Sequence, residues 1–431
     1  MDPLGILADD LTGACDCAAP FAARGARVAV RLLPGDPAPR PGPWDVLVVN
    51  TDSRNRLPAE ARARVRRGAS ALRQAGWPLG FKKIDSTLRG HLGAEIEELL
   101  ALGVARAWVA PAFPAYGRTV EAGRLLVHGA PLEATELRSD GLAPLAAGQI
   151  AAAFGPACEP IGRLTLALLD QGTPVVGTQV RLDRMRGCPV IVCDATEPRH
   201  LRVVARLLRD REIAEPRELL VGSAGLSREL AAVLIPEPPA PAAPEAAPAA
   251  SAIRTGPVLV IAGSRQRATQ DQVETLARAP GVVQVLLDPA HLDDGAAAWL
   301  AEAEAAGRRA LATGASALIL TVRQHGAGAV AQDSAGLAAR AQQILAALGC
   351  LTAQLVPAIA PRGLVLTGGD VALAALRALG TDHLAIEGEV LPGMARARIG
   401  AGPHSGLPVV TKAGGFGDAQ ALVAVLRALR P

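Results

Sequence analysis

Polar side chains of several kinds are concentrated in six short segments of the N-terminal half, and each segment directly follows an apolar stretch. These segments are residues 8–14, 50–54, 82–91, 111–119, 194–196 and 222–225. They hold carboxylates, which accept hydrogen bonds from hydroxyl groups, and serines and threonines, which donate or accept them. They also hold arginine, whose guanidinium can bind a carboxylate through two parallel hydrogen bonds. Together these side chains suit a small ligand that carries both hydroxyl groups and a carboxylate.

The residues of this set divide by the role that their chemistry allows. Arg89 with Lys82 or Lys83 can bind a carboxylate. An aspartate beside a ligand hydroxyl can also accept its proton, and Asp9 and Asp10 are the candidates for this catalytic role. The predicted ligand-binding residues are Asp9, Asp10, Ser53, Arg54, Lys82, Lys83, Asp85, Ser86 and Arg89.

Each of these residues also has a purely structural explanation. Asp10 or Thr12 can cap a helix, and this explanation is as good as the functional one for either residue taken singly. Arg89 and Lys82 can form surface salt bridges. The recurrence of polar segments at one topological position favours a binding site over these explanations.

Three glycine-rich segments of the C-terminal half, residues 262–265, 367–370 and 412–417, also follow apolar stretches. Glycine lets main-chain N–H groups approach an anion closely, and a helix N-terminus adds a favourable dipole. The segments therefore predict polyphosphate binding. The chain has no Gly-Lys pair, and so no Walker A loop, and no G-x-G-x-x-G segment opens a strand–helix unit. This excludes the usual P-loop nucleotidases and dinucleotide-binding enzymes.

Lysine is rare in this chain. Only three of the 44 basic residues are lysines, namely Lys82, Lys83 and Lys412, and all three follow apolar stretches. The bias indicates that lysine is kept where a compact ammonium group is needed and a planar guanidinium would not serve.

The elements that must position these segments alternate between short apolar strands and amphipathic helices. The helix predicted over residues 58–76 has Ala61, Val65, Ala69 and Leu72 on one face. Continuous apolar strands separated by helices predict two α/β domains, each a mainly parallel sheet covered by helices on both faces. The predicted strands are residues 4–8, 27–32, 46–50, 81–84, 107–110, 190–193, 219–221, 258–262, 283–287, 317–321, 363–366 and 408–411.

A proline-rich stretch divides the chain. Six prolines between residues 236 and 248 rule out a helix or a sheet there and favour an extended linker. We therefore predict domains at residues 1–234 and 257–431, joined by a linker at residues 235–256. The first would bind the polyhydroxy acid and the second the nucleotide.

Composition excludes several other classes of protein. The net charge of +3 and an aromatic content of 2% do not suit nucleic-acid binding. No apolar run reaches the roughly 18 residues that a membrane-spanning helix needs, and the acidic start does not resemble a signal peptide. We therefore expect a cytoplasmic protein without a membrane partner. The six cysteines and seven histidines are scattered, so buried thiols are expected in place of a metal or redox site.

Five blocks of the sequence resemble the signature blocks of the four-carbon acid sugar kinases, in the same order along the chain. They are Asp9-Asp-Leu-Thr-Gly-Ala14, Lys82-Lys-Ile-Asp-Ser-Thr-Leu-Arg-Gly90, Pro111-Ala-Phe-Pro114 with Gly117-Arg-Thr119, Thr367-Gly-Gly-Asp370 and Lys412-Ala-Gly-Gly-Phe-Gly417. The resemblance covers essentially the whole chain. The form of the second block is more similar to the D-threonate and D-erythronate kinases than to the 3-oxo-tetronate kinases.

The resemblance implies an ATP-dependent enzyme that phosphorylates the terminal 4-hydroxyl of a tetronate, with Mg²⁺ as a further cofactor. It places the ATP contacts on Ser264, Gly368, Gly369, Asp370 and Gly414, and Lys412 lies in the same block as Gly414. Asp370 is a candidate to contact the metal. The third loop reads Ala-Gly-Gly where relatives often have Ser at its first position, which removes one hydroxyl contact.

Three alternatives stay open at this point: a 3-oxo-tetronate kinase, a non-catalytic sensor of sugar acid and nucleotide, and an oxidoreductase with an unusual dinucleotide site. The expected partners are a sugar acid and ATP or ADP, with no nucleic acid. The sequence does not choose between a monomer and a homodimer, between stereoisomers of the acid, or between Asp9 and Asp10 as the base.

Overall fold

The computed structural model describes residues 2–33, 35, 44–135, 148–207, 217–236, 255–263, 266–292, 297–323 and 334–429. The chain forms two compact units, Met1–Ala240 and Pro241–Pro431. The two predicted domains fall one in each unit. Most of the predicted linker, at residues 237–254, lies outside the described residues.

The N-terminal unit is built on a parallel sheet with the strand order β2, β3, β1, β4, β11, β5, β10, β9. Its central strands are buried along their whole length, except for the first two residues of β4, because helices cover both faces. The strands are β1 (Leu4–Ala8), β2 (Val28–Arg31), β3 (Val46–Asn50), β4 (Leu79–Lys83), β5 (Arg106–Ala110), β9 (Ile161–Leu164), β10 (Val190–Cys193) and β11 (Glu218–Gly222).

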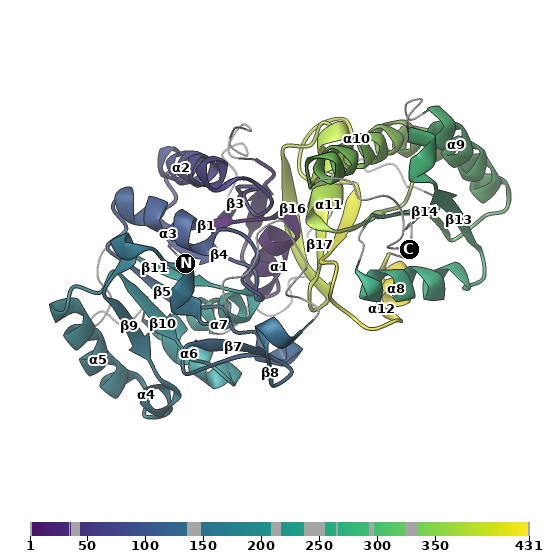
Figure 1. Ribbon diagram of the computed structural model, residues 1–431. Coiled ribbons are helices and arrows are strands. Elements are labelled where there is room, and N and C mark those ends of the chain that lie inside the picture. The colour runs from purple at the N-terminus through teal and green to yellow at the C-terminus, as the bar shows by residue number, and fades with distance from the viewer. Residues whose placement is uncertain are drawn as a thin grey trace. The chain divides into compact units, whose positions relative to one another are not determined.

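The helices of this unit pack in two groups. Helices α1 and α7 pack on each other, and so do α2 and α3. Successive residues of a strand point to opposite faces, and Lys83 of β4 approaches α1 whereas Lys82 pairs with α3, so the two groups cover opposite faces (Figure 1). The helices are α1 (Leu11–Ala22), α2 (Pro58–Gln74), α3 (Leu92–Ala101), α4 (Leu166–Asp170), α5 (Thr173–Met185), α6 (Pro198–Arg206) and α7 (Ala224–Leu234).

The C-terminal unit is built on a mixed sheet with the order β13, β14, β12, β15, β18, β17, β16. Strands β13, β14, β12, β15 and β18 are parallel, whereas β17 pairs antiparallel with both β18 and β16. The strands are β12 (Val258–Ala262), β13 (Val282–Leu287), β14 (Ala317–Val322), β15 (Leu364–Thr367), β16 (His383–Leu391), β17 (Met394–Ile399) and β18 (Pro408–Lys412).

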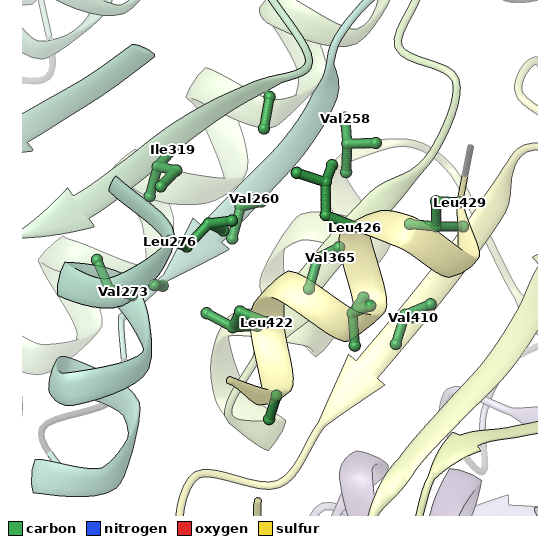
Figure 2. Close-up of a cluster of buried hydrophobic side chains, with 14 of the residues drawn as sticks. Val258, Val260, Val273, Leu276, Ile319, Val365, Val410, Leu422, Leu426 and Leu429 are labelled. Atoms are coloured by element: carbon green, nitrogen blue, oxygen red, sulfur yellow. The ribbon is translucent and has the colours of Figure 1, made fainter. Parts of the chain in front are cut away.

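The core of this unit shows the same division into two faces. Alternate residues of β12, Val258 and Val260, face α8 (Arg267–Ala277) and α12 (Ala421–Ala428), which pack together over Leu276 and Leu422 (Figure 2). Helices α9 (Ala297–Ala312), α10 (Ser334–Ile359) and α11 (Gly369–Ala378) lie on the other side of the sheet (Figure 1). The predicted α/β class is therefore confirmed.

All twelve predicted strands are present, with ends that agree to within two residues. Strands β9, β16 and β17 were not predicted, nor was the small antiparallel sheet of β6 (Arg118–Glu121), β7 (Arg124–Val127) and β8 (Ala130–Pro131). These strands lack a continuous apolar run, because they are partly exposed on one face and alternate polar with apolar residues.

One helix departs from the expectation that no segment could cross a membrane. Residues Ala339–Ile359 of α10 are long and apolar enough to do so by length and composition alone. This is weak evidence, because a helix in the interior of a domain passes the same test, and α10 packs against α9 and α11. Of the six cysteines, five are buried as expected and Cys350 is exposed.

We expect residues 1–236 and 255–431, produced separately, each to fold with a cooperative unfolding transition, because each unit has its own buried core. Circular dichroism and calorimetry on the two fragments would test this. A fragment that stays unfolded alone would contradict the division into two domains.

Candidate functional site

The polar segments of the N-terminal unit meet because β1 lies between β3 and β4, parallel to both. Ala8, the last residue of β1, is in register with Asn50 of β3 and Lys83 of β4. The segments that follow the three strands therefore leave the sheet at the same edge. Main-chain bonds extend this pairing beyond the strands, since Ser53 N and Arg54 N both donate to Asp9 O, at 3.0 and 3.2 Å.

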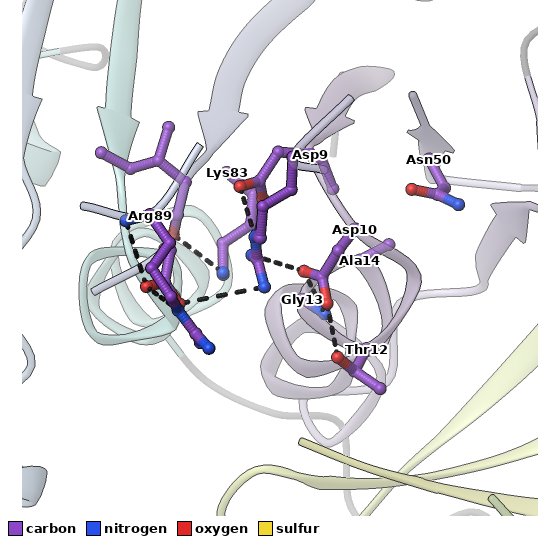
Figure 3. Close-up of polar contacts among 12 residues, drawn as sticks. Asp9, Asp10, Thr12, Gly13, Ala14, Asn50, Lys83 and Arg89 are labelled. Carbon is purple, nitrogen blue, oxygen red and sulfur yellow. Dashed lines mark hydrogen bonds and ion pairs between the residues drawn. The ribbon is translucent and has the colours of Figure 1, made fainter. Parts of the chain in front are cut away.

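Asp10 caps helix α1. Its carboxylate accepts hydrogen bonds from Gly13 N at 3.0 Å and from Thr12 Oγ1 at 2.6 Å (Figure 3). A β-carbon at position 13 would lie 2.3 Å from Asp10 Oδ1 and 2.9 Å from Lys83 Nζ. Only glycine fits there, and its absence of a side chain lets the Lys83 ammonium group approach the start of the helix.

Arg54 lies among three carboxylates. Its Nε and Nη2 atoms donate to the two oxygens of Asp9 at 2.8 and 2.9 Å, and Nη2 also lies 2.6 Å from Asp10 Oδ1. Its Nη1 atom lies 3.9 Å from Asp85 Oδ1. The guanidinium therefore compensates the negative charge that the ends of β1 and β4 bring together.

A second arginine completes this group. Arg89 Nε and Nη2 donate to the two oxygens of Asp85 at 2.8 and 3.0 Å, and Thr87 Oγ1 also donates to Asp85. Leu88 lies between Thr87 and Arg89 in the chain. It has a left-handed φ of 61°, which a tight turn around the Asp85 carboxylate requires. We call Asp9, Asp10, Asp85, Arg54 and Arg89 the carboxylate site.

The charges in this site shift the acidities of its buried members. Burial raises the pKa of Asp9, but the charges of Arg54 and then Lys82 outweigh this effect and hold the pKa below its usual range. Burial likewise raises the pKa of Asp85, and Arg89 and Arg54 bring it well below its usual range. Both carboxylates are therefore ionised at neutral pH.

The two adjacent lysines of β4 point to opposite faces of the sheet. Lys83 Nζ lies on the α1 side and donates to Ile84 O at 2.9 Å. Lys82 is fully buried on the α3 side, where its ammonium group pairs with Glu95 Oε2 at 2.6 Å. Lys82 as a ligand-binding residue stays a prediction: its ammonium group is paired with Glu95 on the α3 side of the sheet, and its charge also acts on Asp9.

The predicted hydroxyl contacts are less accessible than expected. Ser53 is fully buried, and its Oγ shares a hydrogen bond with Thr51 Oγ1 at 2.8 Å. Ser86 is buried as well. Asn50, which belongs to the same segment as Ser53, donates to Leu32 O and lies apart from the carboxylates (Figure 3).

One cation near the carboxylate site was not among the predicted ligand-binding residues. Arg118 begins β6, stacks over the Tyr116 ring at 5.7 Å and has its pKa lowered by burial. Asp85 and Arg89 are the charges that act on it most strongly, so it lies within electrostatic range of the site. Arg118 could have been identified in the sequence from the Gly117-Arg-Thr119 block, because its guanidinium has the same chemistry as that of Arg89.

The glycine loops of the C-terminal unit also share one edge of a sheet. Strands β12, β15 and β18 are neighbours and parallel, and they end just before Gly263, Gly368 and Ala413. Gly368 precedes α11 with a φ of 89°, a conformation that favours glycine. Gly369 and Asp370 form the first turn of α11, and the Thr367 hydroxyl is buried without a partner among the described residues.

Lys412, the last residue of β18, is fully buried at this edge. Its Nζ donates to Thr269 Oγ1 at 3.1 Å, Ala413 O at 3.0 Å and Gly414 O at 2.9 Å. Burial lowers its pKa to about 7. Ser264, the other predicted nucleotide contact in this unit, lies outside the described residues.

Comparison with known proteins matches both halves of the chain. A family model described as "Sugar-binding N-terminal domain" matches residues 4–230, and one described as "Nucleotide-binding C-terminal domain" matches residues 259–422. The chain is 37% identical to a D-threonate kinase of Bordetella bronchiseptica, over 99% of this chain and 97% of that protein. It is 30% identical to a D-erythronate kinase of Heliobacterium modesticaldum (98% and 95%) and 32% identical to a 3-oxo-tetronate kinase of Methylobacterium radiotolerans (96% of each). A solved structure from Salmonella typhimurium LT2 has the same fold, with a TM-score of 0.79 at 22% identity over the whole of both chains.

The position of Arg54 predicts a large effect on stability. We expect Arg54→Met to lower the free energy of unfolding of the N-terminal unit by roughly 3–5 kcal/mol, because it leaves buried carboxylates uncompensated. Urea denaturation followed by circular dichroism would measure this loss.

Arg27→Met is the matched control, since Arg27 pairs with Asp45 through a side chain that is 54% exposed. Arg27→Met should lower the free energy of unfolding by less than about 1 kcal/mol. Equal losses in the two variants would contradict the role of Arg54 in charge compensation.

Proposed function

The chain belongs to the four-carbon acid sugar kinase family and is therefore a phosphotransferase, and we propose that it transfers the γ-phosphoryl group of ATP to the terminal 4-hydroxyl of D-threonate or D-erythronate. The observation that carries this proposal is the carboxylate site, which gathers three carboxylates and two arginines at the carboxyl edge of one sheet. Such a set can recognise the hydroxyl groups and the carboxylate of a small sugar acid.

Asp10 is the better candidate for the base. Both oxygens of Asp9 are held by Arg54, its side chain is 4% exposed, and its pKa is lowered. Asp9 is therefore a weak proton acceptor, and we assign it to holding Arg54 in place. Asp10 is 13% exposed; its Oδ1 caps the helix and pairs with Arg54, whereas its Oδ2 accepts only from the Thr12 hydroxyl, which can rotate and leave that oxygen to a ligand.

We assign the substrate carboxylate to the basic side chains around Asp85. Arg89 is 23% exposed, more than Arg54 at 13%, and can bind a ligand from the edge that faces away from Asp85. Lys83, whose charge acts on Asp9, and Arg118, which lies within electrostatic range of Asp85, add positive charge to the site. Lys82 has no part in this assignment, because Glu95 occupies its ammonium group.

We assign the nucleotide to the glycine loops of the C-terminal unit. The start of α11 at Gly368 and Gly369 and the loop that contains Gly414 are suited to phosphate, since both present main-chain N–H groups at a sheet edge. The buried Thr367 hydroxyl, which has no partner among the described residues, is a further donor.

Mg²⁺, when bound, would neutralise charge on the β- and γ-phosphates. The described residues contain no group of three or more His, Cys, Asp or Glu placed to hold a metal ion. This suits an ion held mainly by phosphate oxygens and water with one protein carboxylate, and we assign that role to Asp370.

In the proposed reaction the 4-hydroxyl oxygen attacks the γ-phosphorus and its proton passes to the Asp10 carboxylate. A new oxygen–phosphorus bond forms, the bond between the γ-phosphorus and the β,γ-bridging oxygen breaks, and ADP leaves. Most of the rate enhancement comes from positioning and charge compensation, so the arginines matter as much as the base.

Assays of ADP release with purified protein, Mg·ATP and a panel of D-threonate, D-erythronate, their L-isomers and 3-oxo-tetronates would test the proposal. We expect a kcat/KM for D-threonate or D-erythronate at least about tenfold above the others, the discrimination that roughly 1.4 kcal/mol gives. Preference for a 3-oxo-tetronate would assign the chain to the 3-oxo-tetronate kinases, and turnover of none of these acids would reject the substrate class.

Substitution of the two aspartates would separate their roles. Asp10→Asn should lower kcat about 100-fold or more while KM for the acid changes little, because the amide keeps an oxygen for Gly13 N and Arg54 but cannot accept a proton. Asp9→Asn should instead reduce stability and raise KM, because it loosens Arg54. A near-normal kcat in Asp10→Asn would reject Asp10 as the base.

A further inference from the structure

The ammonium group of Lys412 has all of its donors engaged within its own unit. An ammonium group carries three N–H bonds, and Lys412 Nζ has three acceptors, the hydroxyl of Thr269 and the carbonyls of Ala413 and Gly414, at 2.9–3.1 Å. The side chain is also fully buried. In this arrangement no donor is left for a phosphate.

Helix α8 binds the same loop from its buried face. Thr269 Oγ1 donates to Gly414 O at 2.8 Å, and Gln272 Nε2 donates to Phe416 O and Gly417 O at 3.0 and 2.9 Å. Thr269 and Gln272 are three residues apart and therefore neighbours on one side of the helix. Together with Lys412 they bind four carbonyl groups of the loop at residues 413–417.

The direction of these carbonyls fixes the direction of the N–H groups. In a planar trans peptide the C=O of one residue and the N–H of the next point in opposite directions. The carbonyls of Ala413 and Gly414 point at the Lys412 ammonium group, so the N–H groups of Gly414 and Gly415 point away from it. Neither N–H has an acceptor within the part of the chain that the structure describes, and two successive N–H groups of this kind form an anion-binding concavity.

We propose that Lys412 is a positioning residue for the nucleotide: with Thr269 and Gln272 it holds the loop so that the N–H groups of Gly414 and Gly415 face the phosphates, and it does not itself contact them. This inference rests on the proposed nucleotide site, and it replaces the prediction that Lys412 binds ATP directly.

Isothermal titration of full-length protein with ADP, together with steady-state kinetics, would test this. Lys412→Met and Thr269→Val should each raise the Kd for ADP and the KM for ATP by about tenfold or more, the size expected for loss of a hydrogen bond to a charged group. kcat should change less than about threefold, because the loop binds the nucleotide and does not act on the transferred group. The double variant should bind ADP no more weakly than Lys412→Met alone, since Thr269 acts on Gly414 O, which Lys412 also binds, and on Lys412 itself.

Thr381→Val is the matched control, since Thr381 is also a buried threonine of this unit and its hydroxyl has no partner among the described residues. It should leave the Kd for ADP unchanged. A large drop in kcat with unchanged Kd in Lys412→Met, or effects of the two single variants that multiply, would overturn the inference. So would normal ADP binding by both variants. Failure of the folded wild-type protein to bind ADP would overturn the proposed function, and the inference with it.

Discussion

The N-terminal unit depends on the charge compensation that Arg54 provides. The parallel arrangement of β1 and β4 brings Asp9, Asp10 and Asp85 to one edge, and three carboxylates in a buried setting repel one another strongly. Arg54 reaches all three, and main-chain bonds to Asp9 fix the segment that carries it. Three carboxylates can therefore form a site for hydroxyl groups only if an arginine of the fold compensates their charge before the ligand binds.

The same charge compensation gives the two adjacent aspartates different surroundings. The bidentate contact to Arg54 lowers the proton affinity of Asp9, and this makes it a structural anion. Asp10 has a different set of partners, the first turn of α1 and one guanidinium nitrogen. Sequence adjacency made the two residues indistinguishable, whereas the direction of each side chain separates them.

Much of the fold could be predicted because its strands are buried on both faces and appear as continuous apolar runs. Strands β16 and β17 could not, because their alternating pattern is that of a sheet with one covered face. The carboxylate site was predictable for a related reason, since parallel strands share an edge at which their polar ends collect. The opposite directions of Lys82 and Lys83 follow from the alternation within β4 and were not considered, and Arg118 was not considered because it follows a turn and begins an antiparallel strand.

The three lysines share a geometry that accounts for their persistence in an arginine-rich chain. Lys82, Lys83 and Lys412 are all buried at the end of a parallel strand, and each donates to the carbonyl of the residue that follows it. For Lys83 and Lys412 that carbonyl is the first one beyond the strand, and for Lys82 it is that of Lys83, the last residue of β4. A compact ammonium group with three tetrahedral donors can turn back on its own chain and still reach a second partner, as Lys82 reaches Glu95 and Lys412 reaches Thr269. A planar guanidinium is too large and too rigid for this. Lysine is therefore retained where a buried side chain must bind the main chain at the end of its own strand.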